Sequence, residues 1–424
     1  MRSALDAGNL NVVHAASVAR VRDRGGPRRG CEQFELDLVH DGAIAIRAGK
    51  IAAVGPTADV LRDFGDEDVQ VIDATGKTVL PGLVECHSHP LFAGERSDEY
   101  AERLDGVPLG EIAARGGGIW RTVCDTRTAP PADLTESAAT AYRQILAGGV
   151  TTLEVKSGYG LTVETELLHL ELLNRTRALT PLDLVVTFLG AHIVPRDTGD
   201  ADQYTQLVAT QMLPAVVRSR LAEFHDLTCE KGLFTPSQAS RLLTISAELG
   251  IPTRTHADAW APSEGWKTSV EGGAVSADHL TYTPDDEIRE VGQADTIAVL
   301  LPMAELIYLT DKRCNARLLI ENDVPVAIAT DYCSSIHSTS LLVSIALAAP
   351  WFGVPPAAAI VGATLNAAYS LNRGHDRGSL DVGKRGDLTI LQCAHPNEIA
   401  LALGSPVVEA VLIDGRQVIG TKAL

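Results

Sequence analysis

The stretch that decides the fold is Val79-Leu80-Pro81-Gly82-Leu83-Val84-Glu85-Cys86-His87-Ser88-His89. Its apolar part is typical of a buried strand, and it ends in two histidines one residue apart. In a strand, residues i and i+2 point to the same face, so His87 and His89 can direct their ring nitrogens at one point beyond the strand end. Two imidazoles placed in this way suit a metal ion. Two surface histidines in a loop are the alternative, and the rest of the chain decides between the two interpretations.

Length and composition limit the class of protein. The 424 residues are enough for one large α/β barrel plus an accessory domain, and 45% hydrophobic residues give a sizeable core. A net charge of −18 without a long basic run argues against nucleic-acid binding. An anionic small molecule remains compatible with this charge, because one local arginine can dominate a pocket.

The cysteines and apolar stretches indicate the compartment. Seven cysteines are scattered without a CxxC pair, which predicts a reducing, cytoplasmic location. Residues 1–6 begin no long apolar run, so no secretory signal is expected. The longest uncharged apolar stretch, residues 341–363, contains Pro350, Pro355 and Pro356. It therefore predicts two buried helices joined by a turn, and not a membrane span.

Both ends of the chain are predicted to form short strands. The N-terminal strands cover residues 10–14, 43–47, 51–55 and 69–73. The C-terminal strands cover residues 387–391, 410–413 and 416–418, with an Asp414-Gly415 turn between the last two. Two β-rich ends around a long middle predict one small composite β-sandwich domain, residues 1–78 and 372–424.

The middle, residues 79–371, alternates between strands and helices. Eight strands are predicted at residues 79–84, 150–155, 184–189, 222–228, 251–255, 274–277, 296–301 and 324–330. Helices are predicted at residues 134–147, 163–177, 201–218, 236–249 and 316–321. This is the count and length of a (β/α)8 TIM-like barrel, so we expect an α/β fold of that kind with the composite domain attached.

The active site of such a barrel lies at the carboxyl ends of its strands, so the polar residues that follow each strand matter most. These residues are His87 and His89, Lys156 and Tyr159, His192, His256, Asp278 and His279, and Asp331. His87, His89, His256 and Asp331 offer three nitrogens and one oxygen, which suits Zn²⁺, with Fe²⁺ as an alternative. A metal held there would activate water, Asp331 could accept its proton, and His279 could orient the water or stabilise an oxyanion.

Two further residues leave alternatives open. Lys156 could carry a carbamate that bridges two metals, or it could be an ion-paired lysine, and we favour a single metal. Arg96 could bind a substrate carboxylate in bidentate fashion, or it could form a structural ion pair. Residues 91–131 are long for one loop, and Arg115-Gly116-Gly117-Gly118 within them is typical of a mobile or ligand-approaching piece.

With these residues in view, the chain resembles the amidohydrolase superfamily, and within it the imidazolonepropionase family. The matching segments are PGLVECHSHPLFAGERSDEY (81–100), TTLEVKSGYGLT (151–162), TFLGAHIVP (187–195), AVSADHL (274–280), IATDY (328–332) and DRGSLDVGKRGDLTIL (376–391). The resemblance implies a metal-bearing barrel that hydrolyses the ring C–N bond of imidazolone propionate to formiminoglutamate. It makes His87, His89, His256 and Asp331 the metal ligands. It also implies substrate contacts at Arg96, Tyr159 and His192, and a catalytic-site role for His279.

The chain departs from the family pattern at two places. The family carries a proton-shuttling glutamate three residues after the third metal histidine, where this chain has Ala259. The family also has Asn-Pro-Gly-Ser-like text after the metal aspartate, where this chain has Cys333-Ser334-Ser335-Ile336-His337. General acid–base help is worth roughly 10²–10⁴ in rate, so Asp258, Glu264 or His337 would have to substitute. We also expect His337 to contact substrate.

These observations predict a metal-dependent hydrolase of a small, carboxylate-bearing cyclic amide or imide, with an altered proton shuttle and product loop. Imidazolonepropionase proper is one alternative. A non-hydrolytic lyase or cyclase, or a binding protein that has lost turnover, is the other. The expected partner is a small molecule, with no nucleic acid and no membrane. A homodimer remains open.

Overall fold

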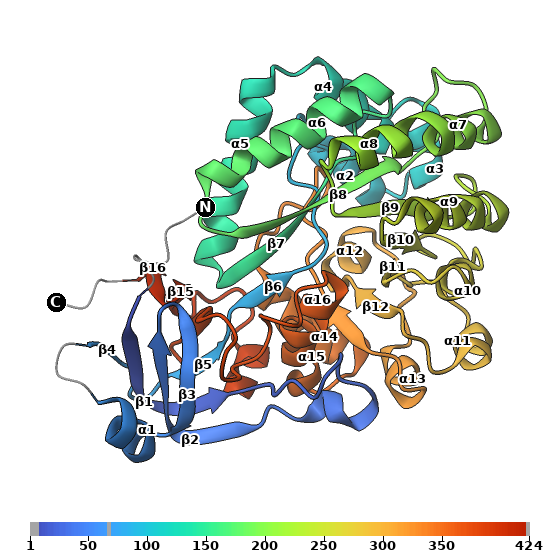
Figure 1. The fold of residues 1–424 in the computed structure, drawn as a ribbon. Helices are drawn as coiled ribbons and strands as arrows, with labels where there is room; N and C mark the ends of the chain where they lie inside the picture. Colours follow the sequence, from blue (N-terminus) through green and yellow to red (C-terminus); the bar gives the residue numbers. More distant parts are fainter. Residues whose placement is uncertain (1–7, 66–68, 421–424) are drawn as a thin grey trace.

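The computed structural model describes residues 8–65 and 69–420. Eight parallel strands form a nearly closed barrel around its centre (Figure 1). In order of hydrogen bonding they are β6 (Leu83–Glu85), β7 (Val150–Lys156), β8 (Asp183–Ala191), β9 (Phe224–Cys229), β10 (Thr253–Ala257), β11 (Ser276–His279), β12 (Ile297–Leu300) and β13 (Val326–Ile328). Beyond the ends of β6 and β13, Ser88 and Tyr332 form a parallel bridge that links the two strands. The predicted (β/α)8 barrel is confirmed.

Helices surround the barrel on its outer side (Figure 1). They are α5 (Pro131–Ala147), α6 (Val163–Thr176), α7 (Ala201–Leu207), α8 (Leu213–Ser219), α9 (Pro236–Leu249), α10 (Gly265–Glu271), α11 (Asp285–Val291), α12 (Pro302–Ile307), α13 (Ala316–Glu321), α14 (Leu341–Phe352), α15 (Pro356–Gly362) and α16 (Leu365–Ser370). The helix predicted over 201–218 contains a π-helical turn at Val208–Met212. Pro214 follows this turn, and a proline cannot supply the regular i→i−4 hydrogen bond.

Helices occupy two of the longer segments considered in the sequence. Residues 341–363 form the two predicted helices, α14 and α15, with Gly353 in the left-handed conformation between them. Residues 91–131 hold three short helices, which are α2 (Ser97–Leu104), α3 (Leu109–Ala114) and α4 (Ile119–Thr128). No helix within residues 8–65 and 69–420 is both long and apolar enough to cross a membrane.

Strands from both ends of the chain share a second, mixed sheet. Its hydrogen-bonded order is β16 (Arg416–Ile419), β15 (Val408–Ile413), β14 (Leu388–Leu391), β5 (Thr78–Pro81), β1 (Leu10–Ala19), β2 (Leu38–Arg47) and β3 (Lys50–Pro56), with β4 (Gln70–Asp73) beside β1. The short helix α1 (Thr57–Phe64) follows β3. Strands from both termini pack their apolar side chains into one buried cluster. The predicted composite domain thus exists as an eight-stranded sheet. Residues 1–7, 66–68 and 421–424 of its predicted range, and with them the prediction of no secretory signal at residues 1–6, lie outside the described residues.

The single strand predicted over 79–84 is wrong, because two strands of different sheets occupy that stretch. β5 pairs with β1 and β14 in the mixed sheet, whereas β6 belongs to the barrel. Pro81 has no N–H to donate and ends one ladder. The Gly82 N–H donates to the carbonyl of Asp387 at 2.8 Å. Gly82 is thus the point where the chain passes from one domain into the other.

This crossing leaves no room for a side chain. A Cβ at Gly82 would lie 2.3 Å from Oγ1 and 2.5 Å from Cγ2 of Thr151. We expect Gly82→Ala to lower the free energy of unfolding by about 1–3 kcal/mol, because the β-branched Thr151 cannot rotate away freely. Urea titration measures this, with Gly26→Ala as the matched control because nothing lies within 4 Å of its Cβ position. Equal stability of both variants would contradict the claim that Gly82 packs too closely against Thr151 to accept a side chain.

Candidate metal centre

Three histidines and one aspartate meet at the carboxyl ends of the barrel strands. His87 and His89 follow β6, His256 lies in β10, and Asp331 follows β13. The three histidines each offer a nitrogen, and these nitrogens lie within 4.8 Å of one another. Nε2 of His87 is 3.3 Å from Nε2 of His89, and Oδ1 of Asp331 is 3.5 Å and 3.6 Å from these two nitrogens. The structure therefore brings together the four predicted metal-ligating residues, all of them buried.

Two carboxylates orient the histidines from behind. Oδ2 of Asp278 is 2.6 Å from Nδ1 of His87, and Oδ1 of Asp226 is 3.1 Å from Nδ1 of His256. An ionised carboxylate only accepts, so each Nδ1 carries the proton and each Nε2 presents its lone pair to the centre. Nε2 of His256 is buried and has no hydrogen-bond partner among the described residues. This donor set and this unpartnered nitrogen fit a divalent metal ion.

Burial sets the protonation of the centre. It lowers the pKa of His87, His89 and His279 well below the usual value of 6.5, so these imidazoles are neutral at pH 7. Neutral imidazole is the form that binds metals. Burial also raises the pKa of Asp331 to about 7. Burial disfavours the charged form of any group, so it raises the pKa of a carboxyl group and lowers that of an imidazole.

A buried charge cluster lies under the histidines and fixes the two orienting carboxylates. Nζ of Lys156 is 2.6 Å from Glu154 and 2.7 Å from Asp226. The Arg254 guanidinium is 3.2 Å from Asp278 and 3.4 Å from Glu154. All five side chains are fully buried. Lys156 thus has the ion-paired environment, and the carbamate alternative finds no support in its surroundings.

The sequence interpretation missed three members of this charge cluster, Glu154, Asp226 and Arg254. Each lies inside a barrel strand whose every residue is buried, and burying an unpaired charge is very costly. Charged residues within such strands were the available signal. His225, which lies inside β9, is buried with Nδ1 at 2.7 Å from Oγ of Ser246.

Three of the four residues predicted to contact substrate, Arg96, Tyr159 and His192, line one small cavity together with His89, His256 and Asp331 of the metal-ligating set. This metal-centre cavity is lined by His89, Arg96, Ile119, Tyr159, His192, Thr228, Glu230, His256, Ala259, Trp260, His279, Tyr308, Asp331 and Cys333. The ring of His192 stacks on His89 with centroids 5.3 Å apart, and its Nδ1 is 3.0 Å from the carbonyl of Gly158. Nε of Arg96 is buried without a hydrogen-bond partner in the described chain. Its guanidinium is therefore available to a ligand.

The three predicted substitutes for the missing glutamate lie elsewhere. His337 is exposed, with its ring 6.2 Å from that of Phe92, and it does not line the metal-centre cavity. Glu264 is exposed at the start of α10. Asp258 is buried, but its carboxylate accepts hydrogen bonds from the backbone of Ser263, Gly265 and Trp266. The structure therefore does not place these three side chains at the reacting centre, because two face solvent and one holds a loop.

Glu230 is a carboxylate at the cavity that the sequence interpretation did not consider. It directly follows β9, which was the signal for it. Its oxygens accept hydrogen bonds from the N–H groups of Ala259 at 2.6 Å and Ala261 at 3.0 Å, and from the Ser263 hydroxyl at 3.0 Å. Glu230 thus fixes the loop that carries Ala259 and Trp260.

The loop that departs from the family pattern is compact. Cys333 and Ile336 exchange backbone hydrogen bonds of 3.0 and 3.1 Å, and Oγ of Ser334 is 2.8 Å from Oγ1 of Thr122. Burial raises the pKa of the Cys333 thiol to about 11, so the thiol stays protonated at pH 7. Of this loop, Cys333 reaches the metal-centre cavity.

Comparison with known proteins agrees with this geometry. The amidohydrolase family profile matches residues 78–418, and the profile of a bacterial imidazolonepropionase-like composite domain matches residues 42–66. The chain belongs to the amidohydrolase family. Members of this family use a divalent metal, and this protein is a hydrolase that acts on carbon–nitrogen bonds.

Similar proteins carry a more specific name. The chain is 42% identical to imidazolonepropionase of Geobacillus kaustophilus, over 91% of this chain and 92% of that protein. It is 39% identical to imidazolonepropionase of Haloarcula marismortui, over 90% of each. Among solved structures, zinc-complexed atrazine chlorohydrolase TrzN from Arthrobacter aurescens superposes with a TM-score of 0.71 at 17% identity, covering 97% of this chain and 95% of that one. This last likeness shows the fold.

The buried charge cluster gives a testable consequence. Lys156→Met would leave Glu154 and Asp226 without their buried cation, and we expect a loss of about 3–5 kcal/mol in the free energy of unfolding. Chemical denaturation compares it with Lys312→Met, which removes an exposed lysine. A loss below about 1 kcal/mol for Lys156→Met would mean that the cluster does not depend on this cation.

Proposed function

We propose that this protein is a zinc-dependent hydrolase that opens a small cyclic amide or imide carrying a carboxylate. The observation that supports this most is the convergence of three buried imidazoles and Asp331 beside the unpaired Nε of Arg96. The relatives named imidazolonepropionase are similar over nearly their whole length, which favours a related substrate. Imidazolone propionate is therefore the first compound to test.

His87, His89, His256 and Asp331 would hold the metal ion. A bound zinc ion lowers the pKa of a water molecule and polarises a carbonyl group. Fe²⁺ is the alternative ion for this ligand set. The carboxylates of Asp278 and Asp226 keep the Nε2 lone pairs of His87 and His256 turned to the ion.

The remaining side chains would bind substrate and move protons. Arg96 binds the substrate carboxylate, while Tyr159 and His192 position the ring. His279 orients the attacking water or stabilises the oxyanion. Asp331 accepts the proton of the water, and the Tyr308 hydroxyl, 3.5 Å from its Oδ2, helps to hold it in place. Because Ala259 cannot carry a proton, Asp331 also delivers the proton to the leaving nitrogen.

The surroundings of the enzyme are part of the proposal. All seven cysteines, each within the described parts of the chain, are free, which supports a cytoplasmic location. The expected partner is the small-molecule substrate, without nucleic acid or membrane.

The first test is turnover of imidazolone propionate by zinc-loaded protein, measured beside Ala259→Glu. We expect slow turnover by the unmodified protein and a gain of roughly 10²-fold in the variant, since general acid–base catalysis contributes about 10²–10⁴. Robust turnover by the unmodified protein would identify it as an imidazolonepropionase in which another residue carries the proton. Absence of turnover in both the unmodified protein and the Ala259→Glu variant would exclude imidazolone propionate as substrate. For any substrate that is turned over, solvent oxygen-18 in the product distinguishes hydrolysis from a lyase or cyclase reaction.

The metal set is tested by metal content. We expect one zinc ion per chain in the unmodified protein and loss of nearly all of it in His256→Ala, because this variant removes one of the four ligands, the unpartnered Nε2. Atomic absorption after dialysis measures this. His337→Ala is the matched control, since this exposed histidine lies away from the centre and should leave metal content unchanged. Retention of zinc by His256→Ala would refute the ligand set.

A further inference from the structure

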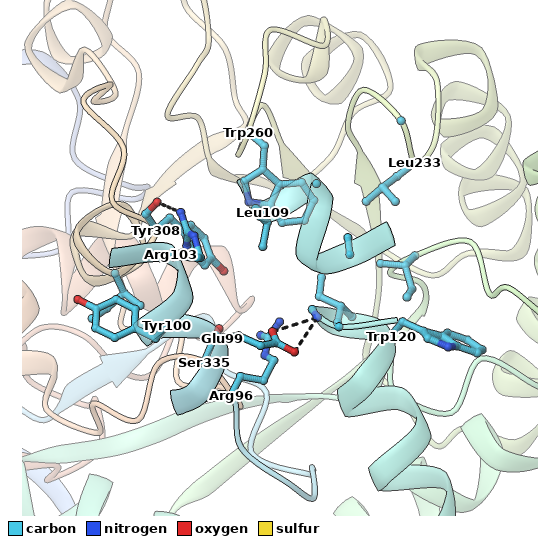
Figure 2. Close-up of a pocket in the computed structure, with 18 of the residues that line it drawn as sticks. Arg96, Glu99, Tyr100, Arg103, Leu109, Trp120, Leu233, Trp260, Tyr308 and Ser335 are labelled. Carbon is cyan, nitrogen blue, oxygen red and sulfur yellow. Dashed lines mark hydrogen bonds between the residues drawn. The ribbon is translucent and has the colours of Figure 1, made fainter. Parts of the chain in front are cut away.

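A second, larger cavity opens outside the metal-centre cavity. This outer chamber has a volume of about 620 Å³. It shares Arg96, Ile119, Trp260 and Tyr308 with the metal-centre cavity, so these four residues form the junction between the two. Its walls include parts of α2 and α3, which lie in the long segment between β6 and α5 (Figure 2). The chamber thus adjoins the metal-centre cavity at these four residues.

The wall of the outer chamber is largely apolar. Figure 2 shows Leu109, Trp120, Leu233 and Trp260 around the opening. Such side chains favour an apolar or aromatic group of a ligand. The chamber is therefore unlike a water-filled entrance lined with polar side chains.

The charged residues on the wall are mainly cationic. Among the described residues that line the chamber, Arg96, Arg103, Arg196 and Lys231 are basic and Glu99 is acidic. The Glu99 carboxylate accepts the Gly118 N–H at 3.0 and 3.1 Å, so it is already engaged by the backbone. In a chain with a net charge of −18, this local excess of positive charge attracts an anionic ligand.

Two buried donors at the junction lack partners. Within the described chain, neither Nε of Arg96 nor Nε1 of Trp260 has a hydrogen-bond partner. Buried donors are normally paired, so each calls for an acceptor from a ligand. A carboxylate suits Arg96, and a neutral oxygen or nitrogen acceptor suits the Trp260 N–H. Trp260 directly follows Ala259, so the two positions together shape the junction.

We propose that the substrate carries an aromatic or similarly large apolar substituent, in addition to its carboxylate, and that this substituent occupies the outer chamber. Cavities of about 300–1,000 Å³ suit ligands of drug size, which exceed one five-membered ring with a propionate chain. The carboxylate pairs with Arg96 at the junction, and the scissile ring lies at the metal. This inference rests on the proposed function and names its substrate class.

The test compares two ligands that differ only in the apolar group. Hydantoin 5-propionate is the small probe, and the same compound with a benzyl group on one ring nitrogen, in each of its two isomers, is the large probe. Isothermal titration calorimetry with zinc-loaded protein measures both affinities. We expect at least one benzyl isomer to bind about tenfold tighter than the small probe, because it buries an aromatic ring.

A pair of neighbouring variants separates the chamber from general effects. Ala113 lines the outer chamber, whereas the adjacent Ala114 is exposed and does not. Ala113→Trp should remove the tenfold preference and leave the small probe's affinity unchanged, and Ala114→Trp should leave both affinities unchanged. Trp260→Phe keeps an aromatic ring but loses the indole N–H, so it should weaken the binding of both probes by about threefold to tenfold.

The outcomes distinguish the inference from the proposed function. Equal affinities of small and large probes, or binding of the small probe alone, would overturn the inference and leave the proposed function standing. A preference that survives Ala113→Trp would also overturn it, because the benzyl group would then lie elsewhere. If no probe binds and imidazolone propionate is not turned over, the proposed function fails and the inference fails with it.

Discussion

The site depends on the buried charge cluster of Glu154, Lys156, Asp226, Arg254 and Asp278 under the barrel mouth. Two cations share three carboxylates here at distances of 2.6–3.4 Å, in a space without exposed surface. Unpaired, any of these charges would be too costly to bury, so each one requires the others. The cluster forms only when the barrel brings β7, β9, β10 and β11 together, with β8 between β7 and β9. Barrel formation and charge pairing are therefore one event.

The same cluster defines the chemistry above it. Asp226 contacts His256 through Oδ1 and Lys156 through Oδ2, whereas Oδ2 of Asp278 contacts both His87 and Arg254. Each of the two carboxylates accepts a hydrogen bond from the Nδ1–H of its histidine, which fixes the imidazole tautomers. A metal-ligating set with fixed tautomers needs little rearrangement to bind an ion. In this way a core interaction far from solvent determines which nitrogen of His87 and His256 faces the reacting centre.

The sequence predicted the elements that follow simple periodicity, and the ligands that follow strand ends. His87, His89, His256 and Asp331 were identifiable because a barrel collects the ends of its strands at one mouth. Asp226 and Glu154 were missed because they lie within strands, where the inward or outward direction of a side chain depends on register. The split at Gly82 was also missed, since two adjacent apolar strands of different sheets have the same pattern as one.

The prediction that His337 contacts substrate was wrong for a related reason. A sequence gives the order of residues in a loop, but the direction of each side chain depends on how the loop folds. The tight turn from Cys333 to Ile336 directs Cys333 to the metal-centre cavity and leaves His337 in solvent beside Phe92. Loops have few constraints of their own, so their contribution to a site emerges only when the neighbouring elements are in place.

The two halves of the site are constrained to different degrees. The metal centre is held by paired charges whose loss would destabilise the barrel, so its residues can change little without loss of the fold. The outer chamber is built from short helices and loop residues, where an apolar side chain can be exchanged at small cost. Ala259 and Trp260 lie at the boundary between these halves, on a loop where Glu230 binds the backbone N–H groups of both residues and not their side chains. A loop held in this way keeps its course while its side chains vary, which allows substrate preference to change with the metal chemistry intact.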